Sequence, residues 1–313
     1  MRRIIPFIHT LPGEEEAKWT AAIERLSPDV LLRPPALLSE AERAAARIAV
    51  VANPDPADLR GLPSLVWVHS LWAGVEKLAP YMPDHVAIVR MTDPQLAATM
   101  AEAVLAWTLY LHRDMPRYAA QQRARTWRQH ETRRAQERTV GVLGLGHMGA
   151  TAARRLAAND FHVIGWSRTP KIVAGVETFD GADGLAAVLA RADILVLLLP
   201  LTDATRGLIG AGALASMKVG AALINFGRGA LVDDEALLAR LDAGALDHAV
   251  LDVFATEPLP PESPFWAHPR ATVLPHISAT TNVATASRIV ADNLRSYFRD
   301  GTIPPAVDRR AGY

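Results

Sequence analysis

Three polar residues with complementary chemistry follow strand-like runs in the second half of the chain. Arg228 lies in a turn flanked by glycines, Glu257 precedes a proline and His276 follows one. A guanidinium can bind a carboxylate through two parallel hydrogen bonds, a nearby carboxylate favours a protonated imidazole, and an imidazolium can deliver a proton near neutral pH. Individually the three suit a turn residue, a loop cap and a buried histidine. As a set, downstream of a phosphate-binding motif, they predict a redox enzyme that acts on a carboxylate substrate.

A glycine-rich turn of the form G-x-G-x-x-G lies upstream of these residues. Its members with expected cofactor contacts are Gly144, Gly146, His147, Met148 and Gly149. The first glycine permits a tight bend, the second lets backbone amides approach a pyrophosphate, and the third lets a helix pack on a strand. A strand-like run at 140–143, a helical stretch at 150–158 and a second strand at 161–166 supply the context that the motif requires. The sequence therefore predicts a dinucleotide site.

The end of that second strand predicts which dinucleotide is used. An acidic residue that would bind a ribose 2′-hydroxyl is expected about 20 residues after the motif, but the chain has Ser167, Arg168 and Lys171 there. A hydroxyl and cationic groups can hold a 2′-phosphate, which a carboxylate would repel. We expect NADPH to be preferred, with NADH left open as a second cofactor. The alternative is that Arg168 and Lys171 are a solvated loop.

Periodicity predicts two α/β units. In the first half, short apolar runs alternate with helical stretches such as 14–26, which indicates a small parallel sheet; the runs are 4–8, 30–32, 48–51, 65–68 and 86–89. A single long helix is expected from about Gln95 to Gln122. The second unit begins near Thr139, with further strands at 194–199, 222–225, 249–252 and 272–274, and a helix follows at 283–298.

Composition narrows the functional classes. The 313 residues include 33 basic and 33 acidic side chains and no cysteine, which excludes disulfides and thiolate chemistry and does not favour nucleic acid as a partner. Six arginines between Arg123 and Arg138 are diluted by acidic residues, and an exposed or dimer-facing loop is the better interpretation. We expect no metal site, because the histidines lack ligand spacing. We also expect no membrane segment, because the apolar runs are too short.

The motifs together resemble the D-2-hydroxyacid dehydrogenase family, and within it the glyoxylate/hydroxypyruvate reductases. Glu257 follows Arg228 by 29 positions and precedes His276 by 19, which matches the family's order and spacing. The resemblance runs over nearly the whole chain; its other segments are 72–75, 144–149, 199–202, 225–229, 251–254, 257–260 and 307–313.

This resemblance implies the fold and the domain boundaries. It implies a Rossmann-type doubly wound cofactor domain at 100–280, and a flavodoxin-like α/β substrate domain that is discontinuous, at 1–99 and 281–313. It also implies two crossings between the domains, which suit hinge closure.

Site roles follow from the same resemblance. Arg228 would bridge the substrate's carboxylate and carbonyl, His276 would protonate the oxygen, and Glu257 would hold the imidazole. Backbone amides near Ala73 and Gly74 would hold the carboxylate. Trp72 would narrow the pocket, or else serve as a core aromatic at the domain interface.

Three further residues are expected to contact the cofactor. Asp252 would bind the nicotinamide carboxamide, or would cap a turn instead. Pro200 and Thr205 would lie by the adenosine or pyrophosphate, although a threonine there could equally be a helix N-cap.

The expected function is NADPH-dependent reduction of glyoxylate to glycolate and of hydroxypyruvate to D-glycerate, in a cytoplasmic homodimer. Two alternatives stay open. One is an NAD-dependent dehydrogenase of a larger D-2-hydroxy acid, and the other is a dinucleotide-sensing protein without turnover.

Overall fold

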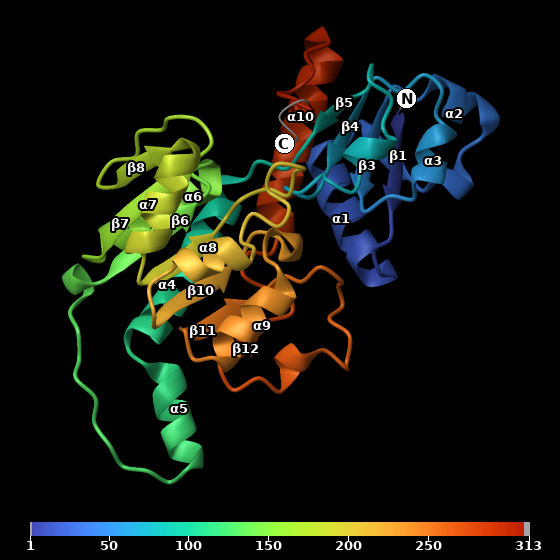
Figure 1. Ribbon diagram of the computed structural model, residues 1–313. Coiled ribbons are helices and arrows are strands. Elements are labelled where there is room, and N and C mark those ends of the chain that lie inside the picture. The colour runs from blue at the N-terminus through green and yellow to red at the C-terminus, as the bar shows by residue number, and fades with distance from the viewer. Residues whose placement is uncertain (1, 310–313) are drawn as a thin grey trace. The chain divides into compact units, whose positions relative to one another are not determined.

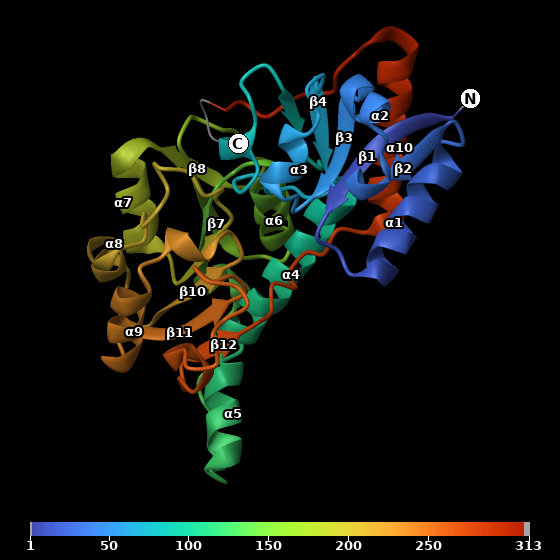
Figure 2. The same ribbon diagram turned by 90° about the vertical axis from the view of Figure 1, so that its right-hand side faces the viewer.

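The computed structural model describes residues 2–309, and its chain divides into two compact units. The first unit comprises the described residues up to Gln95 and those from Thr281 onward, and the second runs from Leu96 to Thr280. Residues Arg310 to Tyr313, which belong to the C-terminal motif, lie outside the described part. Each unit is built around one parallel sheet (Figures 1 and 2).

The first unit contains a five-stranded sheet in the order β2-β1-β3-β4-β5, the flavodoxin-like order. The strands are β1 (Arg3–His9), β2 (Val30–Arg33), β3 (Ile48–Ala52), β4 (Trp67–Ser70) and β5 (Ala87–Val89). The helices are α1 (Gly13–Leu26), α2 (Glu40–Ala45), α3 (Pro56–Arg60) and α10 (Val283–Asp300), with short 3-10 turns η1 (Pro35–Leu37) and η2 (Ala79–Tyr81). The α/β fold with a discontinuous first unit therefore agrees with the predicted fold class.

Both faces of this sheet are buried. On one face α1 contributes Trp19 and Ile23, and α10 contributes Val290 and Leu294. Leu59 of α3 and the leucines of the loop that follows α3 cover the other face. Because both faces are covered, the strands are apolar on both sides, as in β3, whose five residues are all buried.

The second unit contains a seven-stranded sheet in the order β12-β11-β10-β9-β6-β7-β8. The strands are β6 (Thr139–Leu143), β7 (His162–Ser167), β8 (Glu177–Asp180), β9 (Ile194–Leu197), β10 (Ala221–Asn225), β11 (Leu246–Leu251) and β12 (Ala271–Val273). The first strand and the fourth are neighbours, so the strand order reverses between β6 and β9, as in a doubly wound dinucleotide fold. Ligands bind at the carboxyl ends of strands at such a switch point.

Helices cover both faces of the second sheet as well. They are α4 (Pro94–His112), α5 (Met115–Arg123), α6 (His147–Ala157), α7 (Gly181–Arg191), α8 (Ala211–Ser216) and α9 (Asp234–Asp242), with 3-10 turns η3 (Ala135–Glu137), η4 (Gly229–Leu231) and η5 (Pro264–Trp266). Side chains of α4 and α6 pack on one face, and those of α7, α8 and α9 pack on the other.

The prediction of one continuous helix from Gln95 to Gln122 is wrong. The helix is interrupted after His112, and Asp114 takes a left-handed φ of +53° before α5 begins. Pro116 explains the break, since its ring would collide with the carbonyl of His112 in a continuous helix. The expected strand at 65–68 is also displaced, because β4 begins at Trp67.

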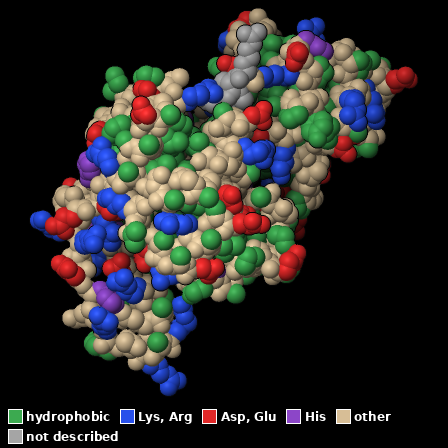
Figure 3. Space-filling view, in the orientation of Figure 1, with side chains coloured by type: hydrophobic (Ala, Val, Ile, Leu, Met, Phe, Trp, Pro, Cys, Tyr) green, Lys and Arg blue, Asp and Glu red, His purple; other side chains and the backbone are tan. Residues whose placement is uncertain are grey.

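The arginine-rich segment after α5 forms an extended loop (Figure 1). The indole of Trp127 is 97% exposed there. Basic side chains gather over this end of the second unit, with acidic ones among them (Figure 3). Among the described residues, no helix is both long and apolar enough to cross a membrane.

Candidate active site

The glycine-rich turn joins β6 to α6, and its geometry requires the glycines. Gly144 has a φ of +101°, and a Cβ there would lie 2.7 Å from the Leu198 carbonyl oxygen. A Cβ on Gly149 would lie 1.7 Å from the Gly144 carbonyl oxygen, so the helix can approach the strand only without a side chain. The turn is thus held close to the loop that follows β9.

Gly146 differs from these two glycines, because a Cβ on it would meet nothing within 4 Å. It is the N-cap of α6, where no side chain caps the first amides, and both Gly146 and His147 are exposed while Met148 is half-buried. Open space in front of uncapped helix amides fits a phosphate group. The residues present therefore fit a dinucleotide.

The loop after β7 is tied to this turn. The Gly144 amide donates to the Trp166 carbonyl at 2.8 Å, and Ser167 follows directly, with its hydroxyl donating to the Thr169 carbonyl at 2.7 Å. Ser167 is buried, whereas Arg168 and Lys171 are exposed. This hydrogen bond brings Ser167 and Arg168 to the same edge of the sheet as the glycine-rich turn.

A carboxylate that the sequence reasoning missed lies beside Ser167. Asp180 is its register partner on β8, a strand that was not predicted. The interval from Gly144 to Asp180 is longer than the usual spacing of the acidic residue, and only strand pairing brings Asp180 next to Ser167.

Arg228 follows β10 in a loop that Asn225 organises. Asn225 is 1% exposed; its side-chain oxygen accepts from the Gly227 amide at 3.2 Å, and its amide nitrogen donates to the Arg228 carbonyl at 3.0 Å. The Arg228 guanidinium donates to the Gly227 carbonyl at 2.7 Å through Nη1. Asn225 was not among the predicted site residues, although its position at the strand end marks it as a loop organiser.

Glu257 and His276 form a direct pair. His276 Nδ1 lies 2.9 Å from Glu257 Oε2, while Glu257 Oε1 accepts from the Phe254 amide at 3.0 Å. The imidazole is half exposed, and its backbone φ is +56°. Since a carboxylate accepts only, Nδ1 carries a proton and Nε2 faces away from Glu257. This is the arrangement that a proton donor at Nε2 requires.

Asp252 is buried at the end of β11, and its carboxylate binds the backbone just after His276. Its two oxygens accept from the amides of Ile277 and Ser278 at 2.7 and 2.9 Å. These bonds fix the segment that carries the strained His276. Asp252 therefore holds the segment after β12, 25 positions further along the chain, and not the turn that directly follows its own strand. Its contact with the cofactor stays a prediction.

Pro200 and Thr205 belong to the loop after β9. The Thr205 hydroxyl donates to the Pro200 carbonyl at 2.7 Å and accepts from the Thr202 amide at 2.8 Å. No helix begins at Thr205, so it is not a helix N-cap. The Thr205 hydroxyl therefore stabilises the loop that follows β9, one of the two strands at the switch point.

Trp72, Ala73 and Gly74 follow β4 in the first unit. The Trp72 indole packs edge-on against Trp19, with ring centroids 6.1 Å apart, and its Nε1 is buried without a protein partner among the described residues. Trp72 therefore contributes to the core of its own unit. Ala73 and Gly74 are half-buried.

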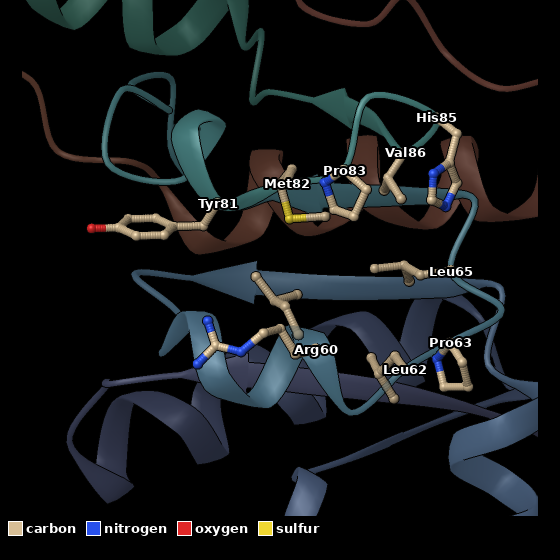
Figure 4. Close-up of a pocket in the computed structure, with 10 residues that line it drawn as sticks. Arg60, Leu62, Pro63, Leu65, Tyr81, Met82, Pro83, His85 and Val86 are labelled. Atoms are coloured by element: carbon tan, nitrogen blue, oxygen red, sulfur yellow. The ribbon is translucent and has the colours of Figure 1, made fainter.

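Two cavities of the described structure lie elsewhere. One groove of about 370 Å³ in the first unit is lined by apolar side chains with Arg60 and His85 at its rim (Figure 4). The other, of about 460 Å³ in the second unit, is polar and includes Arg117 and Asp193. Neither is lined by a predicted site residue. Within residues 2–309, no group of three or more acidic or histidine side chains could hold a metal ion.

Comparison with known proteins adds independent information. The family model described as "D-isomer specific 2-hydroxyacid dehydrogenase, NAD binding domain" matches residues 105–278. Glyoxylate/hydroxypyruvate reductase A of Serratia proteamaculans (strain 568) is 34% identical over 316 residues, which cover 99% of each chain.

Two solved structures are similar over the full length of both chains. A D-isomer specific 2-hydroxyacid dehydrogenase from Xanthobacter autotrophicus Py2, in complex with NADPH and MES, is 37% identical with a TM-score of 0.92. An NADPH-dependent glyoxylate/hydroxypyruvate reductase from Sinorhizobium meliloti, in complex with NADP and sulfate, is 36% identical with a TM-score of 0.90.

Proposed function

The chain belongs to the D-isomer specific 2-hydroxyacid dehydrogenase family, and from that premise we propose that it reduces short 2-oxo acids, glyoxylate and hydroxypyruvate, with NADPH. The relatives named for this activity support the substrate class. NADPH and NADP in the similar structures support the cofactor, with NADH as a second donor.

The observation that carries the proposal is the grouping of Arg228, Glu257 and His276. They follow β10, β11 and β12, which are consecutive in the sheet, so all three leave from the carboxyl ends of neighbouring strands. The Glu257 to His276 hydrogen bond of 2.9 Å already joins two of them. A cation for the substrate and a proton donor are thereby supplied by one edge of the second unit.

The proposed chemistry divides between the cofactor and the protein. When bound, the nicotinamide supplies the hydride that reduces the substrate's C2 carbon. Arg228 binds the carboxylate and the carbonyl oxygen and offsets the negative charge that develops on that oxygen. His276 gives it the Nε2 proton, while Glu257 holds Nδ1 and stabilises the imidazolium. The loop with Trp72, Ala73 and Gly74 is proposed to hold the carboxylate.

The cofactor site is proposed to combine the turn and the loop after β7. The amides behind Gly146, with His147 and Met148, would hold the pyrophosphate, and Ser167, Arg168 and Lys171 would hold the 2′-phosphate. Pro200 and Thr205, in the loop after β9, would lie beside the adenosine or the pyrophosphate of the cofactor.

We further propose that the protein is a homodimer that works in the cytoplasm. The almost fully exposed Trp127 on the extended arginine-rich loop supports self-association, because an isolated indole in water is unfavourable and aromatic residues and arginines are enriched at interfaces.

The decisive experiment follows the oxidation of NADPH and NADH in parallel, with glyoxylate, hydroxypyruvate and pyruvate as substrates. Turnover of the first two acids with an NADPH preference is the expected result. Turnover only with larger 2-hydroxy acids and NAD would favour the alternative dehydrogenase, and tight dinucleotide binding without any turnover would favour a sensing role.

A further inference from the structure

The segment that leaves β4 is held by a series of hydrogen bonds, and from it we infer that His69, Ser70 and Asn293 are positioning residues for the amide of Ala73. This inference rests on the proposed function, which gives that amide the substrate carboxylate. It extends that function by naming the side chains that set the direction of the amide.

His69 is the centre of this network. It is fully buried on β4; its Nδ1 lies 3.0 Å from the Ser70 carbonyl oxygen, and its Nε2 lies 2.9 Å from Nδ2 of Asn293 on α10. A carbonyl only accepts and a side-chain amide nitrogen only donates, so the neutral ring must carry its proton on Nδ1. Both ring nitrogens are thereby satisfied in one tautomer.

Burial keeps this ring neutral. It lowers the pKa of His69 to about 4, against the smaller opposite effect of the Ser70 carbonyl. The two hydrogen bonds consequently persist across the neutral pH range in which a reductase would work.

The following three peptide groups are fixed one after another. The Ser70 carbonyl accepts from His69, while the Leu71 amide of the same group donates to the Val51 carbonyl at 2.9 Å. The Trp72 amide donates to the Ser70 hydroxyl at 3.0 Å. The Trp72 carbonyl then accepts from the Met91 amide at 3.1 Å.

The last of these bonds sets the direction of the Ala73 amide. In a trans peptide the C=O and N–H point in opposite directions. Because the Trp72 carbonyl points toward Met91, the Ala73 N–H points away from it. The direction of this N–H, which is proposed to bind the carboxylate, is therefore set by the peptide groups before it. The Ser70 hydroxyl fixes the middle one of those groups.

The test uses Ser70→Ala, which removes that hydroxyl and no catalytic group. We expect the KM for glyoxylate to rise roughly 5- to 20-fold, with the KM for NADPH unchanged and kcat changed much less. Oxamate, a carboxylate that is not reduced, should show a parallel rise in its inhibition constant. Ser70→Thr, which restores a hydroxyl, should recover most of the affinity.

Ser287→Ala is the matched control. Ser287 is a fully buried serine of α10 in the same unit, and its hydroxyl has no partner among the described residues. It reports what the loss of a buried hydroxyl does to packing alone. Asn293→Leu removes the other end of the network and should raise the same constant, so the test needs no substitution of the buried His69.

The outcomes separate the two ideas. If the wild-type enzyme is active and Ser70→Ala has the same KM for glyoxylate as Ser287→Ala, the positioning role alone is overturned. Absence of wild-type turnover refutes the proposed function. Calorimetric titration with oxamate then decides the positioning role, because it should show weaker binding in Ser70→Ala, and equal or absent binding in both proteins overturns it.

Discussion

At the residue scale, His276 combines a strained backbone with a well-held ring. A φ of +56° is uncommon for a residue with a side chain and costs on the order of 1–3 kcal/mol. The amides after it bind the Asp252 carboxylate, and its Nδ1 binds Glu257. These contacts hold an otherwise unfavourable conformation, which is typical of a functional position.

The first prediction concerns the Glu257 carboxylate. Glu257→Gln replaces the acceptor-only carboxylate 2.9 Å from Nδ1 by an amide that can also donate, so the ring is held less firmly in the orientation and tautomer that reduction needs. We expect kcat for glyoxylate to fall roughly 10- to 100-fold, with little change in NADPH affinity. Steady-state rates at saturating NADPH measure this.

His276→Ala is the comparison for that experiment. It should lower kcat roughly 10²- to 10⁴-fold while NADPH still binds. Loss of NADPH binding in this variant, or a wild-type kcat in Glu257→Gln, would contradict the assigned roles.

The second prediction concerns the 2′-phosphate. Ser167→Asp combined with Arg168→Ala places a carboxylate where an anion should bind and removes a cation, so the ratio of kcat/KM for NADPH over NADH should fall at least roughly tenfold. Lys171→Ala should cause a smaller fall. An unchanged ratio in the double variant would show that the phosphate is bound by other residues, and Asp180→Asn would then be the next variant to test.

At the element scale, two helices that start far apart in sequence share one buried carboxylate. Asp93 is 4% exposed, and its oxygens accept from the Gln95 amide in the first turn of α4 at 2.8 Å and from the Thr285 hydroxyl in the first turn of α10 at 2.6 Å. Gln95 and Thr281 are the residues of the first unit at which the chain leaves for the second unit and returns from it. Asp93 thus joins the two helix starts within that unit.

The third prediction follows from this contact. Asp93→Ala removes a helix cap and leaves the Thr285 hydroxyl with only its longer hydrogen bond, to the Asn282 carbonyl at 3.3 Å, so the free energy of unfolding should fall by about 2 kcal/mol. Asp233→Ala removes an exposed cap of α9 and should cost about 1 kcal/mol. Urea titration compares them, and equal losses would refute the added contribution of Thr285.

At the scale of the whole molecule, each unit buries a histidine that must stay neutral. Burial lowers the pKa of His69 in the first unit to about 4. Burial, with Arg270 and His268 as smaller causes, lowers the pKa of His248 in the second unit to about 4. His248 contacts the Thr272 hydroxyl through Nε2 at 2.9 Å. The stability of both units therefore changes with pH in the same direction.

The fourth prediction gives the sign of that dependence. Unfolded histidine has a pKa of about 6.5, so below that pH the unfolded chain binds protons that the folded chain does not, and stability is lost as the pH falls from about 6.5 toward 4. Each histidine should cost on the order of 2 kcal/mol at pH 5 relative to pH 7. Thermal melts at the two pH values measure this, with His248→Gln reducing the loss in the second unit. Equal melting temperatures at both pH values would contradict it.

Local patterns in the sequence were sufficient for much of the fold. The glycine turn at Gly144, the apolar strand runs and the spacing of Arg228, Glu257 and His276 predicted two α/β units and the family. These signals are encoded in contiguous residues, because turn geometry and strand periodicity are local properties. The same local reasoning missed β8 and extended α4 through Pro116.

Only the tertiary structure decided what holds the candidate site in place. Asn225 beneath the Arg228 loop, Asp252 behind His276, Asp180 beside Ser167 and the bond between His69 and Asn293 depend on which strands and helices become neighbours. The residues of that last pair are 224 positions apart. A hydrogen bond over such a separation leaves no periodic trace in the sequence, since it exists only after the sheet order and helix packing have formed.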